Sequence, residues 1–410
     1  RMWLYNLGIS LYAGGIRLAA LWHGKARLWS EGRRNIFERM EAAVRPSDRI
    51  VWVHAASLGE FEQARPIIER LRAEHPEYKI LLTFFSPSGY EIRKNYEGAD
   101  YVFYLPADTP SNARRFLDIV HPEIAIFIKY EFWINLLSEL RRRKVRSYIV
   151  SAIFRRNSVF FRPYGAMWRQ ALETFDTLFV QNVESKRLLS EIGFDNVVVA
   201  GDTRFDRVAQ IAAAAQRVET IERFRGGGRL FVAGSTWGPD EEILLPLVNA
   251  NPDVKFVIAP HEMDEGRIAH LMRNAKGGAV RYTQCDAATR FDDVQVLVLD
   301  TMGMLSSVYG SATWAYVGGG FGVGIHNTLE AATFGLPIAF GPNYGKFKEA
   351  RDMVSLGCAV SVRTAGELAA WFAPLCDDEE TLRRASRTAK DYTARNQGAT
   401  GIILRSIFNS

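Results

Sequence analysis

Cysteine is scarce in this 410-residue chain, which holds only Cys285, Cys358 and Cys376. The three are far apart and odd in number, and no CxxC pair or Cys/His ligand spacing occurs. These features argue against a disulfide framework and against a zinc module, and a reducing compartment is expected.

Several motifs of catalytic and nucleotide-binding proteins are also absent. No P-loop, GxSxG or HExxH motif occurs, and the glycines between positions 318 and 324 do not fit GxGxxG. These absences argue against a P-loop enzyme, an α/β-hydrolase, a zincin and a dinucleotide fingerprint. There is no DxD pair either, so a metal bridging a nucleotide diphosphate would lack its usual carboxylate ligands. We therefore expect no metal site and no cofactor.

Positive charge is concentrated at the start of the chain. The formal net charge is +5, and residues 1–50 alone hold nine Lys/Arg against four Asp/Glu. The rest of the chain is therefore neutral overall, which argues against a nucleic-acid binder, whose basic residues follow a groove or face of the folded domain. The distribution favours a basic N-terminal segment beside an anionic surface.

The segment Met2–Trp22 is about as long as a bilayer span needs to be, but it contains Asn6, Arg17 and three glycines. Basic residues follow it, as expected of a cytoplasmic flank. Residues 1–30 are therefore predicted to form a membrane anchor or an amphipathic helix lying in the interface. A buried helix of the first domain is the alternative.

From Arg49 onward, short apolar runs alternate with amphipathic segments of helical length. The runs begin with "RIVWVHA" and "KILLTF" and, after a break at residues 201–228, resume with "RLFVAGS" and "VKFVIAP". Strands buried on both faces and joined by helices predict parallel sheets. We expect an α/β protein of the GT-B type, with two doubly wound, Rossmann-like domains at residues 31–205 and 206–376 and a helical segment at 377–410. Ligands bind beyond the carboxyl ends of such strands, so the site is expected in the cleft between the domains.

Two strand-to-helix junctions in the first domain carry candidate catalytic groups. In "HAASLGE", Glu60 stands where a helix begins; it is either a general base or part of a capping box with Ser57. In "IKYEFW", Lys129 and Glu131 lie two residues apart at the end of a strand, so they share a face if the chain is still extended. They are candidates for the catalytic site or for a simple ion pair.

Two junctions in the second domain favour an anionic ligand. Gly234, Ser235 and Thr236 lie between a strand and a helix, where they form either an anion site or an ordinary N-cap. Farther on, "GGGFGVGIHNTLEAATFGLP" places five glycines in seven residues before a helix. Glycines such as Gly319 and Gly320 let a backbone approach a ligand closely.

Polar residues follow these glycines. Asn327 and Glu330 can cap the helix, or they can accept the hydroxyl groups of a ribose. Capping alone does not explain the glycine cluster, so the stretch predicts a nucleotide site.

Together these motifs resemble the 3-deoxy-D-manno-octulosonic acid (Kdo) transferases of lipid A biosynthesis. The resemblance is carried by "HAASLGE", "SPSG", "GDTRFD", "GST", "DTMGMLSSVY" and "VGGGFGVGIHNTLEAATFGLPIAFGPNYGKFKEA", and most specifically by residues 300–350. It implies an inverting, metal-independent GT-B enzyme of a Gram-negative bacterium. Such an enzyme moves Kdo from CMP-Kdo to a lipid A precursor of the lipid IVA type at the cytoplasmic face of the inner membrane, where anionic lipid is a further partner.

The resemblance also assigns residues by position. It implies that Glu60 is the general base, that Lys129 and Glu131 lie in the catalytic site, and that Arg204 acts on developing negative charge. The implied CMP-Kdo site contains Pro260, His261, Met302, Gly303, Met304, Asn327, Thr328, Leu329 and Glu330, beside the Gly234–Thr236 and Gly319–Gly320 segments.

Three positions depart from the family pattern. Lys129 stands where a glutamate is common, His261 where an arginine is common, and Met304 where a glutamate is usual. Two other functions therefore stay open: another GT-B enzyme, such as a UDP-sugar transferase or a 2-epimerase, and a membrane-bound nucleotide-binding regulator that has lost catalysis. Retention of Glu60 argues against the regulator.

Overall fold

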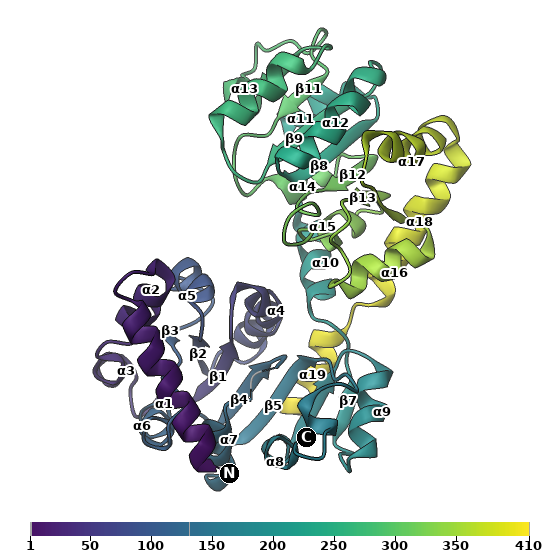
Figure 1. Ribbon diagram of the computed structural model, residues 1–410. Coiled ribbons are helices and arrows are strands. Elements are labelled where there is room, and N and C mark those ends of the chain that lie inside the picture. The colour runs from purple at the N-terminus through teal and green to yellow at the C-terminus, as the bar shows by residue number, and fades with distance from the viewer. Residues whose placement is uncertain (1, 131, 410) are drawn as a thin grey trace. The chain divides into compact units, whose positions relative to one another are not determined.

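The computed structural model describes residues 2–130 and 132–409. The chain divides into two compact units, residues 1–207 with 397–410 and residues 208–396. Each unit holds one seven-stranded sheet with helices around it (Figure 1). The strand pairs within both sheets are parallel. The predicted α/β class with two doubly wound sheets is confirmed.

The sheet of the first unit has the strand order β3-β2-β1-β4-β5-β6-β7. The order of the strands reverses between β1 and β4, and a doubly wound sheet binds its ligands at such a switch point. The strands are β1 (Ile50–Ala55), β2 (Lys79–Phe84), β3 (Tyr101–Tyr104), β4 (Ile124–Ile128), β5 (Arg146–Ala152), β6 (Thr177–Val180) and β7 (Val197–Val199).

Helices cover both faces of this sheet, and one of them comes from the end of the chain. They are α1 (Met2–Ala19), α2 (Gly24–Gly32), α3 (Ile36–Ala43), α4 (Leu58–Glu74), α5 (Pro87–Arg93), α6 (Pro110–Val120), α7 (Ile134–Arg142), α8 (Ala166–Leu172), α9 (Val183–Glu191) and α19 (Ala399–Phe408), with a 3-10 turn at Val159–Phe161. Helix α10 (Arg204–Ala214) leads into the second unit.

The second unit repeats this design with the strand order β10-β11-β9-β8-β12-β13-β14, so its switch point lies between β8 and β12. The strands are β8 (Leu230–Thr236), β9 (Lys255–Pro260), β10 (Ala279–Arg281), β11 (Val296–Val298), β12 (Trp314–Val317), β13 (Ile338–Phe340) and β14 (Ala359–Ser361). The helices are α11 (Glu219–Arg225), α12 (Gly238–Ala250), α13 (Glu265–Asn274), α14 (Leu305–Tyr309), α15 (Leu329–Ala332), α16 (Lys348–Leu356), α17 (Ala365–Asp377) and α18 (Glu379–Arg395), with a 3-10 turn at Tyr282–Gln284.

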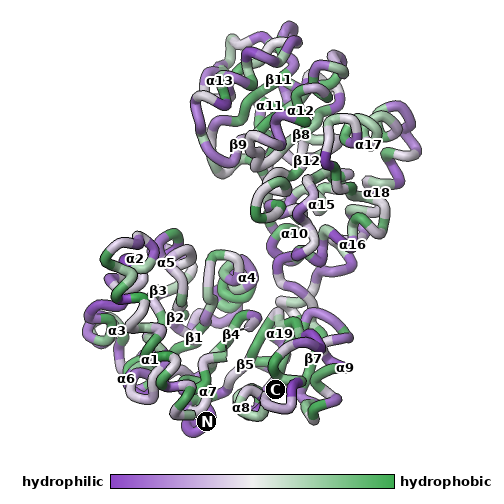
Figure 2. The backbone as a smooth tube through the Cα atoms, in the orientation of Figure 1, coloured by the Kyte–Doolittle hydropathy of each residue, from purple (hydrophilic) through white to green (hydrophobic). Residues whose placement is uncertain are grey.

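Burial on both faces of the sheets explains why the strands read as continuous apolar runs. Along β1, Ile50 and Trp52 pack into one core cluster of the first unit, whereas Val51 and Val53 pack into the cluster on the opposite face. This alternation is the two-residue period of a strand. In Figure 2 the strands of the first sheet are coloured hydrophobic over much of their length. The sheet edges, where the strands end, are therefore the places where polar groups can gather.

The last part of the chain is shared between the units. Helix α18 belongs to the second unit and α19 to the first, with Gln397 beginning the return (Figure 1, yellow). The Asp206 carboxylate accepts hydrogen bonds from the backbone N–H groups of Gly398 (2.6 Å) and Thr400 (2.8 Å). Ile403 and Ile407 of α19 are buried in the first unit's core.

Helix α1 lies at the surface of the first unit, and none of its residues is buried. The Tyr5 hydroxyl donates to Asp108 Oδ2 at 2.6 Å and attaches the inner side of the helix. On the outer side Leu4, Leu11 and Leu18, spaced by seven residues, are 55%, 67% and 60% exposed. Within residues 2–130 and 132–409, no helix combines the length and the apolar character needed to cross a membrane.

Candidate functional site

Glu60 lies at the switch point of the first sheet, in the first turn of the helix that follows β1. The Ser57 hydroxyl donates a short hydrogen bond to the Glu60 carboxylate. Among the described residues Ser57 makes no capping bond to the helix backbone, so the capping box considered from the sequence is not formed. Glu60 is half-buried and keeps contact with solvent. The carboxylate is thus oriented by a neighbour and still accessible to a substrate.

The residues after β4, the strand next to β1, lie close to this carboxylate. Lys129 has a φ of 58°, a left-handed conformation that is uncommon for a residue with a side chain. Tyr130 is 50% exposed. Burial raises the pKa of the Tyr130 hydroxyl; the charge of Arg155 opposes this shift and the charge of Glu60 adds to it. The catalytic candidate Glu131 lies outside the described residues.

Arg204 is held by a buried carboxylate at the start of α10. Its Nε and Nη2 groups donate to Asp202 Oδ2 at 3.0 and 2.8 Å. Burial alone would raise the pKa of Asp202, but the charge and hydrogen bonds of Arg204 hold it below its usual value. Gln63, one turn after Glu60 in α4, also donates to Asp202, at 3.1 Å. Arg204 is therefore connected to the helix that carries Glu60, and part of its charge is already compensated.

In the second unit, the "GST" segment ends β8 at that unit's switch point. Ser235 has a φ of 54°, and the buried Thr236 hydroxyl donates to Glu241 Oε1 at 2.9 Å. The backbone N–H of Trp237 donates to Asp240 Oδ2 at 2.9 Å. The first turn of α12 is thus satisfied by its own carboxylates. The N-cap residue of α12 is Trp237, so the ordinary Ser/Thr cap considered for this junction is not formed, and the anion site stays a prediction.

Three aromatic rings stack at the same edge. The His261 ring stacks against the Trp237 ring, at a centroid distance of 4.8 Å, and against the His326 ring, at 4.3 Å. Trp237 Nε1 donates to His326 Nε2 at 3.1 Å, which requires that nitrogen to be unprotonated. Burial, with a smaller contribution from the charge of His261, lowers the pKa of His326 to about 4. The stack is therefore held together by a neutral histidine at neutral pH.

The fold itself requires much of the glycine cluster. A Cβ atom at Gly318 would lie 2.2 Å from the carbonyl oxygen of Ser235, and one at Gly320 would lie 2.6 Å from Gly341 Cα. Gly319 has a φ of 94°, and its N–H donates to the Asp240 carboxylate at 3.1 Å. The close approach predicted for these glycines is an approach of backbone to backbone, and a ligand is not needed to explain them.

The residues after the glycines connect two loops of the edge. Asn327 Oδ1 accepts from the backbone N–H of Leu329 at 3.0 Å, and Asn327 Nδ2 donates to Glu330 Oε1 at 3.2 Å. Ser306, in the helix that follows the "DTMGM" segment, donates to Glu330 Oε2 at 3.1 Å. The hydroxyl of the buried Thr328 has no partner in the described part of the chain. These bonds leave Glu330 as the link between α14 and α15.

The predicted donor-site residues are thus grouped at one edge of the second sheet. Gly234–Thr236 end β8, Pro260 ends β9 and His261 follows it, and Gly319–Gly320 lie after β12. β8 lies between β9 and β12, so these segments are neighbours. Met302, with 74% of its surface exposed, lies in the loop after β11, the next strand along. Within residues 2–130 and 132–409, no group of three or more His, Cys, Asp or Glu is arranged to hold a metal ion.

Three residues of this edge were not predicted from the sequence. Trp237, Asp240 and His326 organise the loops through the stack and the carboxylate contacts described above. The only signal in the sequence was their position beside the "GST" and glycine segments.

Comparison with solved structures defines the class of protein. The fold is similar to that of UDP-GlcNAc 2-epimerase from Neisseria meningitidis, with a TM-score of 0.61 and 15% identity over 88% of this chain and all of that one. MurG from Acinetobacter baumannii is similar at a TM-score of 0.56 and 13% identity, again covering 88% of this chain and all of its own. The chain therefore has the GT-B fold.

Sequence comparison relates the chain to named enzymes. Residues 33–207 match the family described as 3-Deoxy-D-manno-octulosonic-acid transferase (kdotransferase). The 3-deoxy-D-manno-octulosonic acid transferase of Bordetella pertussis is 28% identical over 87% of this chain and 86% of its own length, and that of Haemophilus influenzae is 25% identical over 88% and 86%. The chain is therefore a glycosyltransferase related to these Kdo transferases, with the family match at residues 33–207.

Proposed function

We propose that this protein transfers Kdo from CMP-Kdo to a lipid A precursor of the lipid IVA type, with inversion and without a metal ion, at the cytoplasmic face of the inner membrane of a Gram-negative bacterium. The observation that carries the proposal is the Glu60 carboxylate, which accepts a hydrogen bond from Ser57 at the switch point of the domain that matches the family. The assignment of CMP-Kdo as the donor and of a lipid A precursor as the acceptor rests on the sequence resemblance described above.

Glu60 acts as the general base on the acceptor. The attacking group is a sugar hydroxyl, and its proton has to leave as the new glycosidic bond forms. The Ser57 hydroxyl orients one carboxylate oxygen and leaves the other to receive that proton. Lys129 and Arg204 supply positive charge to the Kdo carboxylate and to the departing phosphate. The ion pair with Asp202 fixes the direction of the Arg204 guanidinium.

The donor nucleotide binds at the switch-point edge of the second sheet. Glu330 accepts a hydrogen bond from Ser306 of α14 and one from Asn327, and Asn327 and Glu330 accept the ribose hydroxyls of CMP. The neutral His326, the His261 ring stacked on it and the Trp237 indole that donates to it form a rigid set of rings at this edge. His261 takes the place of the arginine that the family commonly has there.

Helix α1 places the enzyme on the membrane surface. Leu4, Leu11 and Leu18 form an apolar stripe at helical spacing, and Leu21 and Trp22 extend it with exposed fractions of 72% and 69%. Lys25 and the arginines that follow lie next to this stripe in the chain. An apolar face flanked by basic residues is the pattern of a helix that lies in the interface of an anionic membrane.

A donor panel tests the proposal. The protein is incubated with CMP-Kdo or with UDP-sugars, in each case with a tetra-acylated lipid A precursor and with or without excess EDTA. We expect transfer from CMP-Kdo alone, unchanged by EDTA. Use of a UDP-sugar in place of CMP-Kdo would contradict the donor assignment. Loss of transfer with EDTA and recovery with Mg²⁺ would contradict the metal-independent mechanism.

A further inference from the structure

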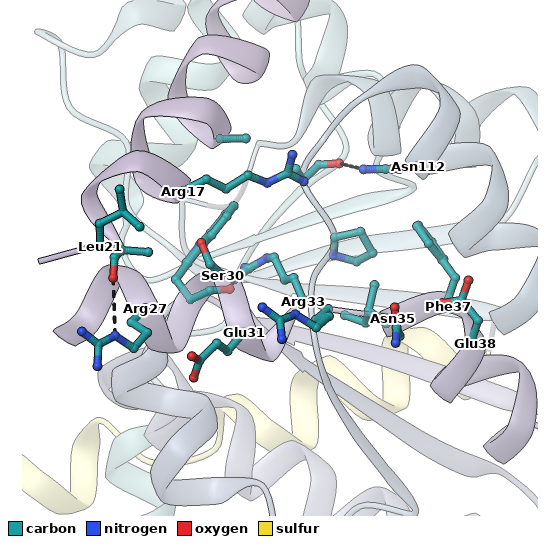
Figure 3. A pocket seen from close by; sticks show the side chains of 17 residues that line it. Arg17, Leu21, Arg27, Ser30, Glu31, Arg33, Asn35, Phe37, Glu38 and Asn112 are labelled. Carbon is teal, nitrogen blue, oxygen red and sulfur yellow. Dashed lines mark hydrogen bonds between the residues drawn. The ribbon is translucent and has the colours of Figure 1, made fainter. Parts of the chain in front are cut away.

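A pocket lies in the first unit, away from Glu60, where α1, α2 and the start of α3 meet the loop after β3. Its volume is about 790 Å³, within the range of sites for small organic ligands. Figure 3 shows side chains from all three helices pointing at the same hollow. Its charged lining consists of four arginines and two glutamates: Arg17, Arg27, Arg33, Arg34, Glu31 and Glu38. The lining is therefore positive on balance.

Arg33 is a half-buried cation without a carboxylate partner in the part of the chain that the structure describes. It donates to the carbonyl oxygens of Leu105 (2.8 Å), Phe85 (2.8 Å) and Trp29 (3.2 Å). Its guanidinium lies 3.9 Å from the Trp29 ring centroid and 4.6 Å from that of Tyr104. Burial lowers the pKa of Arg33 to about 9, so it stays charged at neutral pH. Carbonyl and ring dipoles stabilise this charge only in part, and an anion would complete its environment.

Two further donors at the pocket lack partners. The indole Nε1–H of Trp29, a residue only 5% exposed, and the hydroxyl of Ser30 are buried and make no hydrogen bond within residues 2–130 and 132–409. Both residues line the pocket. Unsatisfied buried donors are rare and costly in native proteins. Trp29, Ser30 and Arg33 therefore form a set of donors that matches a small anion with several acceptor oxygens.

The position of the pocket relates it to the catalytic edge. Strands β3, β2 and β1 are consecutive in the sheet and end in register. Neighbouring strands lie about 4.8 Å apart, so the ends of β3 and β1 are separated by about 10 Å. Arg33 donates to the Phe85 carbonyl, and the Ser86 N–H donates to the Ala56 carbonyl just before Ser57. A head group of two sugars can span this distance.

The rim of the pocket is apolar on one side. Ala13, Ala20 and Leu21 of the α1 region line it, next to the exposed stripe of Leu4, Leu11 and Leu18. An amphiphile whose anionic head enters the pocket can therefore lay its acyl chains along α1. Free phosphate would use the cationic end of the pocket and would leave this rim without a function.

We infer that the pocket formed by α1, α2 and the loop after β3 binds a phosphate monoester of the phosphoglycolipid acceptor, through Arg17, Ser30 and Arg33, and so places an acceptor hydroxyl at Glu60. This inference rests on the proposed function, because it assigns a subsite to the acceptor of that reaction.

The test uses the full chain and substitutions that spare the buried contacts of Arg33. Arg17→Gln removes an exposed charge, and Ser30→Ala removes a hydroxyl that bonds to no described residue. Arg45→Gln, an exposed arginine of the same unit outside the pocket lining, is the matched control. Binding to detergent-dispersed, tetra-acylated lipid A precursor is compared with binding to the same lipid stripped of its phosphates, to phosphatidic acid vesicles and to inorganic phosphate. Melting temperature and transfer are measured in parallel.

We expect Arg17→Gln and Ser30→Ala each to weaken binding of the phosphorylated acceptor about ten-fold or more, as loss of a charge-assisted hydrogen bond does. Neither should change the melting temperature, the KM for CMP-Kdo or the weak binding of the stripped lipid. Arg45→Gln should behave as the wild type. Inorganic phosphate should compete only at concentrations far above those of the lipid.

Three results would overturn the inference: wild-type affinity in both variants, equal binding of both lipids by the wild type, or binding of phosphatidic acid as tight as that of the acceptor. The last result would assign the pocket to a bulk phospholipid. Phosphate-dependent binding without any transfer of Kdo would refute the proposed function and leave the pocket assignment in place.

Discussion

Glu60 is the single residue on which the proposed chemistry depends. Glu60→Gln keeps the shape of the side chain and its contact with Ser57 but removes the capacity to accept a proton. We expect transfer to fall by about 10²–10⁴-fold, while CMP affinity stays unchanged because the nucleotide residues lie in the second unit. Initial rates with saturating acceptor, together with CMP titration, measure both effects.

Glu62→Gln is the matched control for this variant. Glu62 lies two residues farther along α4 and pairs with Arg93 at 3.3 Å. Its neutralisation costs at most about 1 kcal/mol of stability, as for other partly exposed ion pairs, and should leave turnover near the wild-type value. Equal activity of Glu60→Gln and Glu62→Gln would remove Glu60 from the mechanism.

His326 makes the second unit sensitive to mild acid. Its pKa is about 4 in the folded protein and 6.5 in the reference state, so between these values the unfolded chain binds more protons than the folded one. The part of the free energy of unfolding that depends on neutral His326 is therefore fully present above about pH 6.5 and is lost as the pH falls toward 4. For a half-buried ring the loss is about 1–2 kcal/mol, after allowance for solvent screening.

His326→Phe checks this prediction, because it keeps a ring in the stack and removes the titrating group. Thermal melts at pH 7.5 and pH 5 should show a smaller pH-dependent loss for this variant than for the wild type. An identical loss in both proteins would show that His326 does not titrate in this window.

At the residue scale, chemistry was easier to predict from the sequence than geometry. The position of Glu60 at a strand end followed from the alternation of apolar runs and helices. Whether Glu60 is a general base or part of a capping box could not be predicted, because Ser57 and Glu60 have the same spacing in both interpretations. The structure shows that the Ser57 hydroxyl donates to the Glu60 carboxylate. The contacts of Gly318 with Ser235 and of Gly320 with Gly341 join segments distant in the chain, and no local pattern reports them.

At the scale of elements, Glu330 joins α14 to α15, and its two roles can be separated. Ser306→Ala removes the hydroxyl that donates to Glu330 and therefore reports only the structural part. Glu330→Ala removes that bond and the proposed ribose contact together. We expect both variants to lose a similar 0.5–2 kcal/mol of stability, but only Glu330→Ala to weaken CMP binding by ten-fold or more. Equal CMP affinities in the two variants would show that Glu330 has a structural role only.

The outer stripe of α1 is the element that attaches the protein to membranes in our proposal. Leu11→Glu places a charge on a side chain that is 67% exposed, so folding should be unaffected. Co-sedimentation with vesicles that contain anionic lipid should fall several-fold, since burial of one leucine contributes about 1.5–3 kcal/mol.

Leu356→Glu makes the same change at a leucine of α16 that is 46% exposed and lies in the other unit. It should bind vesicles as the wild type does. A similar loss in both variants would indicate a general effect of charge, and undiminished binding of Leu11→Glu would exclude the stripe as the contact.

Strands with an apolar run of their own were predictable, and a short edge strand without one was not. All seven strands of the first sheet follow apolar runs visible in the sequence, whereas β10 (Ala279–Arg281) was missed, because three half-buried residues at a sheet edge give no period. The charged helical pattern of α18 and the apolar one of α19 were taken as one segment. Their assignment to different units depends on Asp206, which binds the Gly398 and Thr400 backbone from far back in the chain.

At the scale of the whole molecule, two doubly wound sheets were predictable because each strand is buried on both faces and each is followed by a helix. The GT-B fold hosts many nucleotide-sugar enzymes, so the fold does not define the donor. The similarity to named Kdo transferases extends along most of the chain. The proposed use of CMP-Kdo depends on loops in which Lys129, His261 and Met304 depart from the family pattern.

The mass of the lipid product tests the central claim most directly. The full-length protein and Glu60→Gln are incubated separately with CMP-Kdo and a tetra-acylated lipid A precursor, and the lipid is analysed by mass spectrometry. The wild type should add the mass of one or more Kdo residues, and the variant should leave the lipid nearly unchanged over the same time. An unmodified lipid after prolonged incubation with the wild-type protein, in the presence of intact CMP-Kdo, would contradict the account.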